Sequence, residues 1–203
     1  MSENVRLELW FPTVIGYVDN PFHKEIEKSL IKRSLEIRAE YPSAEGWIAK
    51  TYNTNSGVYD IEQDDVFKRL SNWISKQVNI FADNSKMRPT FVSTGGWLNI
   101  YQKGDFQEYH IHEDANLSTI YFVSNNEGAS RVIFRSPKNP MNSIKYYEDD
   151  PKSFQETKYA SIPGRLLIFN SDILHCVEAH PLDSLRFSLS YDFIQDIRGN
   201  GQY

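Results

Sequence analysis

Two amphipathic segments in the first half of the chain predict helices that pack on a sheet. Apolar residues recur at helical spacing over residues 61–82, which is typical of an amphipathic helix. An earlier helix is predicted from Asn20-Pro21 to about residue 40. Asn is a favoured N-cap, Pro suits the first helical position, and the backbone before a proline such as Pro42 disfavours helix.

Short apolar and alternating runs dominate the rest of the chain and predict strands. Ahead of the helices, residues 6–18 predict a strand broken by Pro12, and residues 43–60 predict a polar loop with a short strand at most. From residue 90 onward, turn residues separate eight runs that we interpret as strands, near residues 90–101, 107–113, 117–123, 131–135, 157–162, 165–170, 174–179 and 185–193.

This order of elements predicts one mainly β domain of the α+β class over residues 1–203. Eight short strands after two helices favour a sandwich or barrel with the helices buttressing one face. We expect an N-terminal strand and supporting helices (1–89), a β core (90–195) and a tail (196–203). Residues 136–156 are polar with three prolines, a pattern typical of a lid or binding loop, although a solvated insertion explains it equally well.

Composition excludes several classes of protein. Hydrophobic residues make up 40% and charged residues 24% of the chain, as in ordinary globular proteins. The net charge of -5 and the lack of a dense basic run argue against a nucleic-acid partner. Cys176 is the single cysteine, which excludes an intrachain disulfide and fits a reducing, cytoplasmic location. No apolar run is long enough to span a membrane. Oligomeric state is not determined, and a homodimer stays open.

Two histidines in one predicted strand form a candidate metal clamp. His110 and His112 are separated by one residue, and positions i and i+2 of a strand face the same way. Two imidazoles would therefore project side by side, and imidazole suits Fe, Zn, Cu and Ni. The alternative is a plain polar face on a half-exposed strand.

A third histidine lies where it could join them. His175 follows the apolar run 166–169 and the turn residues 170–172, so it is placed to face back into a barrel. A hydrogen-bonded core histidine is the alternative. We expect the other histidines, His23 and His180, at the surface.

One arginine occupies an unusual position for a charged side chain. Arg186 shares one face of the last predicted strand with Ser188, whereas apolar residues occupy the other face. A buried charge needs a partner, and a guanidinium matches a carboxylate bidentately. We therefore expect Arg186 to hold a ligand carboxylate. An internal salt bridge to Glu178 or Asp105 is the alternative.

Three blocks of the sequence resemble the iron(II)/2-oxoglutarate (2OG) oxygenases. The likeness is greatest to the prolyl-4-hydroxylase-like branch and to uncharacterised bacterial and phage proteins with an H-x-H motif, and it covers about residues 95–193. Each block is weak alone, but their order and spacing are specific. The blocks are Tyr101-x-x-Gly104 followed by His110-x-His112, Gly164 to Phe169 leading into His175, and Arg186-x-Ser188.

The resemblance implies a fold and an activity. The fold is a double-stranded β-helix, a jelly-roll or cupin-like barrel. The activity is that of a dioxygenase that uses Fe(II), 2OG and O2 to hydroxylate an unactivated carbon of a peptide, a protein or a small molecule, with release of succinate and CO2. Metal and cosubstrate carry the reaction, while the protein positions the carbon and excludes water.

The resemblance also implies roles for particular residues. His110, His112 and His175 would bind the metal. Arg186 would grip the distal carboxylate of 2OG with help from Ser188, and Tyr101 would reach toward the cosubstrate.

One position departs from the family pattern. His112 stands where the family has Asp or Glu, so the site is predicted to be three histidines rather than two histidines and a carboxylate. A competing interpretation takes His112-x-Asp114 as the ligand pair and leaves His110 outside. The spacing from Tyr101 favours the three-histidine set.

Substrate and class are less well determined. Trp97, Asn99 and Tyr121 are candidates for the substrate pocket, although large aromatics on strands are more often core. Acidic residues near the H-x-H pair could meet a basic substrate or only solvent; they are Glu108, Glu113 and Asp114. Two rival classes remain: a three-histidine cupin-type dioxygenase without 2OG, which has no need of Arg186, and a metal- or ligand-binding barrel that catalyses nothing.

Overall fold

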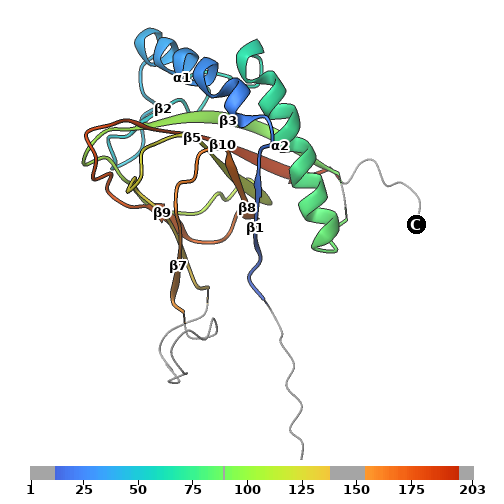
Figure 1. The fold of residues 1–203 in the computed structure, drawn as a ribbon. Helices are drawn as coiled ribbons and strands as arrows, with labels where there is room; N and C mark the ends of the chain where they lie inside the picture. Colours follow the sequence, from blue (N-terminus) through green and yellow to red (C-terminus); the bar gives the residue numbers. More distant parts are fainter. Residues whose placement is uncertain (1–11, 89, 138–153, 197–203) are drawn as a thin grey trace, which may run out of the picture.

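Two antiparallel sheets face each other and carry the candidate residues between them (Figure 1). The computed structural model describes residues 12–88, 90–137 and 154–196. Within these, the larger sheet has the strand order β1 (Ile15–Asp19), β8 (Arg165–Asn170), β5 (Leu117–Ser124), β10 (Arg186–Gln195), β3 (Phe91–Tyr101), β2 (Tyr52–Asn53). The smaller sheet has the order β4 (Gln107–His110), β9 (His175–Val177), β6 (Val132–Arg135), β7 (Glu156–Tyr159).

Two helices cover the outer face of the larger sheet, as the sequence predicts. They are α1 (His23–Glu40) and α2 (Asp65–Asn84) (Figure 1). The side chain of Asp64 caps α2 by accepting a hydrogen bond from the backbone N of Val66. Asn20 was the wrong cap for α1, because that helix begins three residues later and Asn20 accepts from the backbone N of Phe22 instead.

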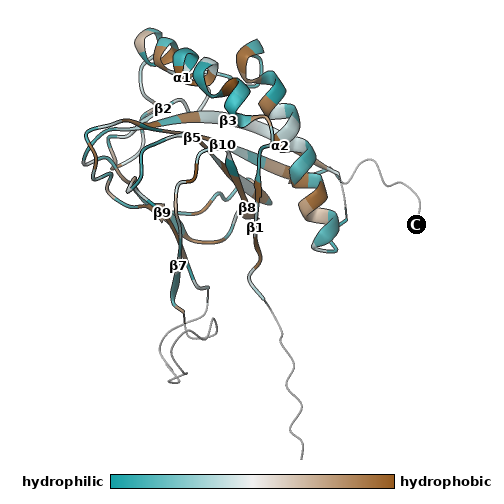
Figure 2. Cartoon of the chain, in the orientation of Figure 1, coloured by the Kyte–Doolittle hydropathy of each residue, from teal (hydrophilic) through white to brown (hydrophobic). Residues whose placement is uncertain are grey.

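Three strands of the larger sheet, β5, β8 and β10, are buried on both faces over most of their length. One apolar cluster joins the sheet to the helices and contains Tyr121 and Leu189, while a second lies between the sheets and contains Phe122 and Phe169. Neighbours along β5 therefore belong to different clusters, as the two-residue period of a strand requires. Figure 2 shows hydrophobic and hydrophilic patches alternating along both helices, which fits their position between core and solvent.

The layout confirms the predicted mainly β fold with supporting helices. All eight predicted strands of the β core are present, but β4, β7 and β9 are shorter than predicted. The prediction that His110 and His112 share one strand was wrong, because β4 ends at His110 and His112 lies beyond it. A six-stranded and a four-stranded antiparallel sheet, counted over the described residues, form the double-stranded β-helix. Most of the predicted loop 136–156 lies outside the described residues.

Two histidines expected at the surface are buried, and that expectation was wrong. His23 begins α1 with its Nδ1 2.8 Å from the hydroxyl of Tyr121. His180 lies beyond the end of β9, with its Nε2 2.7 Å from the carbonyl oxygen of Ser184 and its Nδ1 accepting from the backbone N of Ser130. Both rings are buried because the fold supplies hydrogen-bond partners from distant segments.

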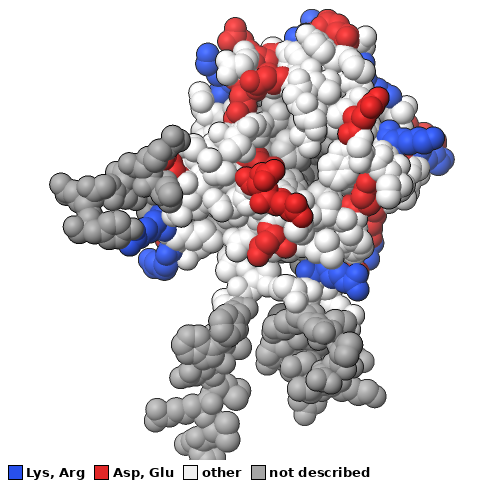
Figure 3. Space-filling model, turned by 180° about the vertical axis from the view of Figure 1, so that it is seen from behind, with Lys and Arg blue, Asp and Glu red and all other residues white. Residues whose placement is uncertain are grey.

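No helix in the described part of the chain is long and apolar enough to cross a membrane. On the face in Figure 3, acidic side chains lie toward the middle and Lys and Arg lie toward the edges. This view shows no basic patch of the kind that a nucleic-acid interface needs.

Candidate metal and cosubstrate site

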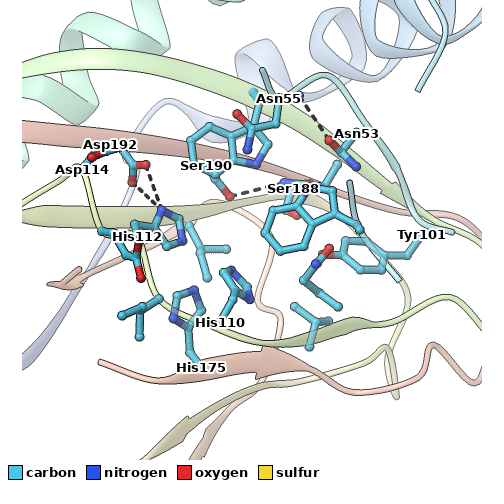
Figure 4. A pocket seen from close by; sticks show the side chains of 18 of the residues that line it. Asn53, Asn55, Tyr101, His110, His112, Asp114, His175, Ser188, Ser190 and Asp192 are labelled. Atoms are coloured by element: carbon cyan, nitrogen blue, oxygen red, sulfur yellow. Dashed lines mark hydrogen bonds and ion pairs between the residues drawn. The ribbon is translucent and has the colours of Figure 1, made fainter. Parts of the chain in front are cut away.

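Three histidines converge at one end of the space between the sheets. His110 ends β4 and His175 begins β9, and the two residues are direct partners across that pair of strands. His112 lies two residues beyond β4, where its backbone N donates to the carbonyl of Ser171. One ring nitrogen from each histidine lies within 4.8 Å of the others (Figure 4). This spacing suits shared coordination of a single ion.

Hydrogen bonds made by Nδ1, the outer ring nitrogen, leave Nε2, the inner one, free to bind a metal. Nδ1 of His110 lies 2.7 Å from the carbonyl of Glu108, and Nδ1 of His175 lies 2.9 Å from the carbonyl of Ile173. Carbonyl oxygens only accept, so each Nδ1 must carry the proton and each neutral ring keeps its lone pair on Nε2. Nε2 of His112 is buried without a hydrogen-bond partner in the described structure. A buried, orphaned nitrogen fits a metal ligand.

The electrostatics of the cluster favour neutral rings. Burial lowers the pKa of His110, and burial together with the neighbouring His110 holds the pKa of His175 well below its ordinary value. Metal binding requires neutral imidazole. These two histidines are therefore ready to coordinate at neutral pH without first losing a proton.

Arg186 is a candidate anion site in the same cavity. Its side chain is fully buried, its Nε donates to Ser161 Oγ at 3.0 Å, and its Nη1 donates to Ser188 Oγ at 3.3 Å. Nη2 has no hydrogen-bond partner in the described structure. The guanidinium carbon lies 4.5 Å from the ring centre of Tyr101 and 5.4 Å from that of Phe122, which positions it by cation–π contact.

The two carboxylates considered as internal partners of Arg186 are engaged elsewhere. Glu178 pairs with Arg131 and Lys158, and Asp105 accepts from the backbone N of Gln102. No carboxylate among the described residues pairs with the buried guanidinium. Burial lowers the pKa of Arg186, and a buried charge without a counter-ion fits a site for a ligand carboxylate.

One cavity of about 280 Å³ connects the histidines with the arginine. Its lining includes Trp97 and Asn99, which the sequence proposed for the substrate pocket, and Trp47 and Gln107, which it did not. Both tryptophans are partly exposed, so the cavity has aromatic walls as well as a polar floor. Trp47 packs on His110 with ring centres 5.1 Å apart.

Tyr121 is a correction, because it lies on the opposite side of the larger sheet. It packs in the cluster beneath the helices, and its hydroxyl contacts His23 and Asn20. Its neighbour Ile120 lines the cavity instead. Every residue of β5 except the last is buried, so local sequence did not reveal which face points inward.

The acidic residues near the H-x-H pair have separate positions. Asp114 is exposed at the cavity wall and is not among the described candidate ligands that lie within 4.8 Å of one another (Figure 4). Glu113 is also exposed there. Glu108 accepts hydrogen bonds from the backbone N of Ile48 and Ala49, so it holds the loop that carries Trp47.

A carboxylate that sequence reasoning missed contacts the metal cluster. Both oxygens of Asp192 lie within hydrogen-bond distance of Nδ1 of His112, at 2.8 and 2.9 Å (Figure 4). The alternation that placed Arg186 and Ser188 on the inward face of β10 also places Asp192 there. This alternation along the strand could have identified Asp192 from the sequence.

Comparisons with known proteins agree with this geometry. Residues 95–192 match the sequence model of a family described as "Putative 2OG-Fe(II) oxygenase". No curated protein matches the chain.

Solved structures with the same fold include two prolyl hydroxylases. A Pseudomonas putida prolyl-4-hydroxylase aligns at 14% identity over 91% of this chain and 94% of that chain, with a TM-score of 0.61. A Trichoplax adhaerens prolyl hydroxylase, in complex with a hypoxia inducible factor peptide fragment, aligns at 15% identity over 93% and 87%, with a TM-score of 0.63. HygX from Streptomyces hygroscopicus, with nickel and 2-oxoglutarate bound, aligns at 10% identity over 91% and 84%, with a TM-score of 0.60. The structural alignments show a shared fold.

Three findings together indicate the class of enzyme: the family match, the barrel and the histidine cluster. The cofactors of that class, Fe(II) and 2OG, fit the donor sets described above: three imidazole nitrogens and a buried guanidinium. The match over residues 95–192, together with the fold and the histidine cluster, indicates a 2OG-Fe(II) oxygenase enzyme.

Proposed function

We propose that this enzyme hydroxylates an unactivated carbon of a peptide, protein or small-molecule substrate. When bound, Fe(II) and 2OG would activate O2, of which one oxygen atom is inserted into a substrate C–H bond and the other enters the succinate that forms from 2OG with release of CO2. The chain itself supplies the binding groups, their orientation and the shape of the cavity.

Each of the proposed roles follows from a contact. His110, His112 and His175 hold the metal through their inner nitrogens, because the outer nitrogens of all three are already hydrogen-bonded. Arg186 donates to the distal carboxylate of 2OG from Nη2, and Ser188 adds a hydroxyl beside it. Tyr101 supports the guanidinium through its ring, whose centre lies 4.5 Å from the guanidinium carbon.

One observation carries the proposal: the cavity that holds the histidine cluster is also lined by Arg186, which is fully buried and has a nitrogen without a partner among the described residues. A three-histidine dioxygenase that does not use 2OG has no reason to bury Arg186. A structural zinc barrel would close a tetrahedral shell around its ion, whereas the described cluster offers three ligands next to an accessible cavity.

The walls of the cavity support a polar substrate of modest width. Asn53, Asn55 and Asn99 supply amide groups along one wall, and Trp47 and Trp97 supply flat apolar surfaces. Amides and indoles together suit a peptide segment or a polar small molecule. The peptide bound to the Trichoplax neighbour is a property of that protein, and it supports testing peptides first.

The proposal is tested by turnover of 2OG. Purified enzyme with Fe(II), ascorbate and O2 is expected to form succinate slowly without substrate and faster with a substrate from a peptide or metabolite library. Mass spectrometry of the accelerating substrate should show one added oxygen atom. Formation of succinate must require both iron and O2.

A matched pair of arginine variants provides the control. Arg186→Met removes the proposed carboxylate site, whereas Arg165→Met removes a surface arginine that pairs with Asp19. We expect loss of succinate formation in the first variant and wild-type behaviour in the second. Iron-dependent oxidation of a substrate that proceeds without 2OG would instead support the cupin-type dioxygenase. Metal binding with no turnover of any kind would support the non-catalytic barrel.

A further inference from the structure

Asp192 distinguishes one of the three histidines from the other two. His110 and His175 donate to neutral main-chain carbonyls, whereas Nδ1 of His112 faces both oxygens of the Asp192 carboxylate at 2.8 and 2.9 Å. Among the described histidines of the cluster, His112 alone has an anionic partner. A carboxylate on the outer nitrogen fixes the ring orientation and makes the inner nitrogen a stronger ligand.

Two serine side chains help to hold the Asp192 carboxylate in place. Ser118 Oγ donates to Oδ1 at 2.7 Å, and Ser171 Oγ lies 2.8 Å from Ser118 Oγ. Ser171 also accepts from the backbone N of His112 through its carbonyl. The carboxylate, the serine pair and the histidine backbone therefore form one connected network.

A break in strand pairing lies beside the same side chain. The register between β10 and β3 shifts between Asp192 and Phe193, so that Asp192 pairs with Gly95 while Phe193 pairs with Ser93. Gly95 has a φ of 147°, a conformation that L side chains rarely adopt. A bulge bends the strand and redirects a side chain. Here it lies directly beside the carboxylate that contacts His112.

Charge explains why this contact matters. A neutral imidazole stands at position 112, where the resembling family carries a ligand carboxylate, so the three ligands contribute no negative charge. We propose that Asp192 is a positioning residue that supplies, through His112, the negative charge that the ligand set lacks. It binds no metal itself. It locks His112 with Nε2 toward the ion and raises the affinity of the cluster for a divalent cation.

This inference rests on metal binding, which is one part of the proposed function, and it is tested without 2OG or turnover. Anaerobic titration with Co(II) gives the dissociation constant and the visible ligand-field spectrum. Asp192→Asn keeps the size of the side chain and an oxygen that can accept from Nδ1 but removes the charge. We expect roughly 10- to 100-fold weaker Co(II) binding, the range for partners of metal-bound histidines, and a shifted spectrum. Asp172→Asn, on the exposed turn before His175, should bind like wild type.

Repeating the test in the His112→Asp variant separates the effect of the Asp192 charge from a purely structural effect of that side chain. His112→Asp places a carboxylate directly at the ligand position, so the charge of Asp192 is no longer needed. We expect Asp192→Asn to leave Co(II) affinity unchanged or improved in that background, which is a coupling between the two sites. An equal loss in both backgrounds would make Asp192 a purely structural residue and overturn the proposal. Unchanged affinity and spectrum in the single variant would overturn it as well.

Folding of every variant is checked by thermal melting of the metal-free protein. If Asp192→Asn does not fold, Ser118→Ala takes its place, because it keeps the charge but removes the hydrogen bond that holds the carboxylate. A several-fold weaker Co(II) affinity is then expected, and wild-type affinity contradicts the proposal. If wild-type protein binds Co(II) but turns over no 2OG, while Asp192→Asn still weakens Co(II) binding, the oxygenase function fails and the role of Asp192 stands.

Discussion

Replacing Arg186 with methionine should separate cosubstrate binding from stability. The guanidinium is fully buried, keeps two hydrogen bonds to serine hydroxyls, and leaves Nη2 without a partner in the described structure. An arginine kept for folding would be fully paired. An arginine that binds a ligand carboxylate is expected to lower the stability of the ligand-free protein. All its N–H groups find hydrogen-bond acceptors only when the ligand is bound.

The magnitudes follow from the contacts. Each hydrogen bond between charged groups contributes about 1.5–3 kcal/mol, so losing two bonds to the cosubstrate weakens 2OG binding by about 3–6 kcal/mol, or roughly 100- to 10,000-fold. In the empty protein the two serine bonds are lost. Replacing a buried charge by an apolar side chain of similar volume is nevertheless often neutral or stabilising, by about 1–4 kcal/mol. We expect Arg186→Met to melt no more than a few degrees below wild type.

Thermal melting with and without ligand measures both effects. With Co(II) in place of iron, 2OG at about 100 times its dissociation constant adds about 2.7 kcal/mol, which corresponds to roughly 5–11 °C for a chain of this size. Wild type should show this shift, and Arg186→Met should show none. Retention of the 2OG shift, or destabilisation of the empty variant by more than about 3 kcal/mol, would refute the reasoning.

Three further predictions concern residues outside the cavity or beneath it. Tyr121→Phe should lower the free energy of unfolding by about 1–3 kcal/mol, because its hydroxyl serves a buried histidine, while 2OG affinity stays at wild-type level in isothermal titration. Burial lowers the pKa of His23 in the folded protein. As pH falls, the unfolded chain therefore binds a proton at this residue first, and the free energy of unfolding decreases below about pH 6.5. Urea unfolding at pH 7 and pH 5 should show a smaller decrease in His23→Asn than in wild type. Phe169→Ala should cost about 3–5 kcal/mol in urea unfolding, since Phe169 is fully buried and packs on His175 with ring centres 4.8 Å apart; a loss below about 1 kcal/mol would contradict this packing.

Strand parity explains which parts of the site were predictable. The last strand alternates between polar and apolar residues, so its sequence alone placed Arg186 and Ser188 on the inward face. The fifth strand is apolar on both faces, and its sequence could not place Tyr121. Parity is informative only where the two faces of a strand meet different environments.

Contacts between distant segments explain what the sequence left open. Strand alternation places Asp192 on the inward face, but its contact with His112, 80 residues away in the sequence, forms only in the assembled fold. His23 and His180 are polar residues in local contexts typical of the surface, and only the assembled fold provides their buried partners. Long-range hydrogen bonds of this kind leave no periodic trace in the sequence.

The most direct test of the central claim is an anaerobic titration followed by visible absorption. Metal-free enzyme receives Fe(II) and then 2OG. We predict a weak charge-transfer band when 2OG is added, absent in His175→Ala and in Arg186→Met and present in Arg165→Met. No band in wild type, together with an iron affinity that 2OG does not change, would contradict the claim that this barrel binds the cosubstrate at its metal.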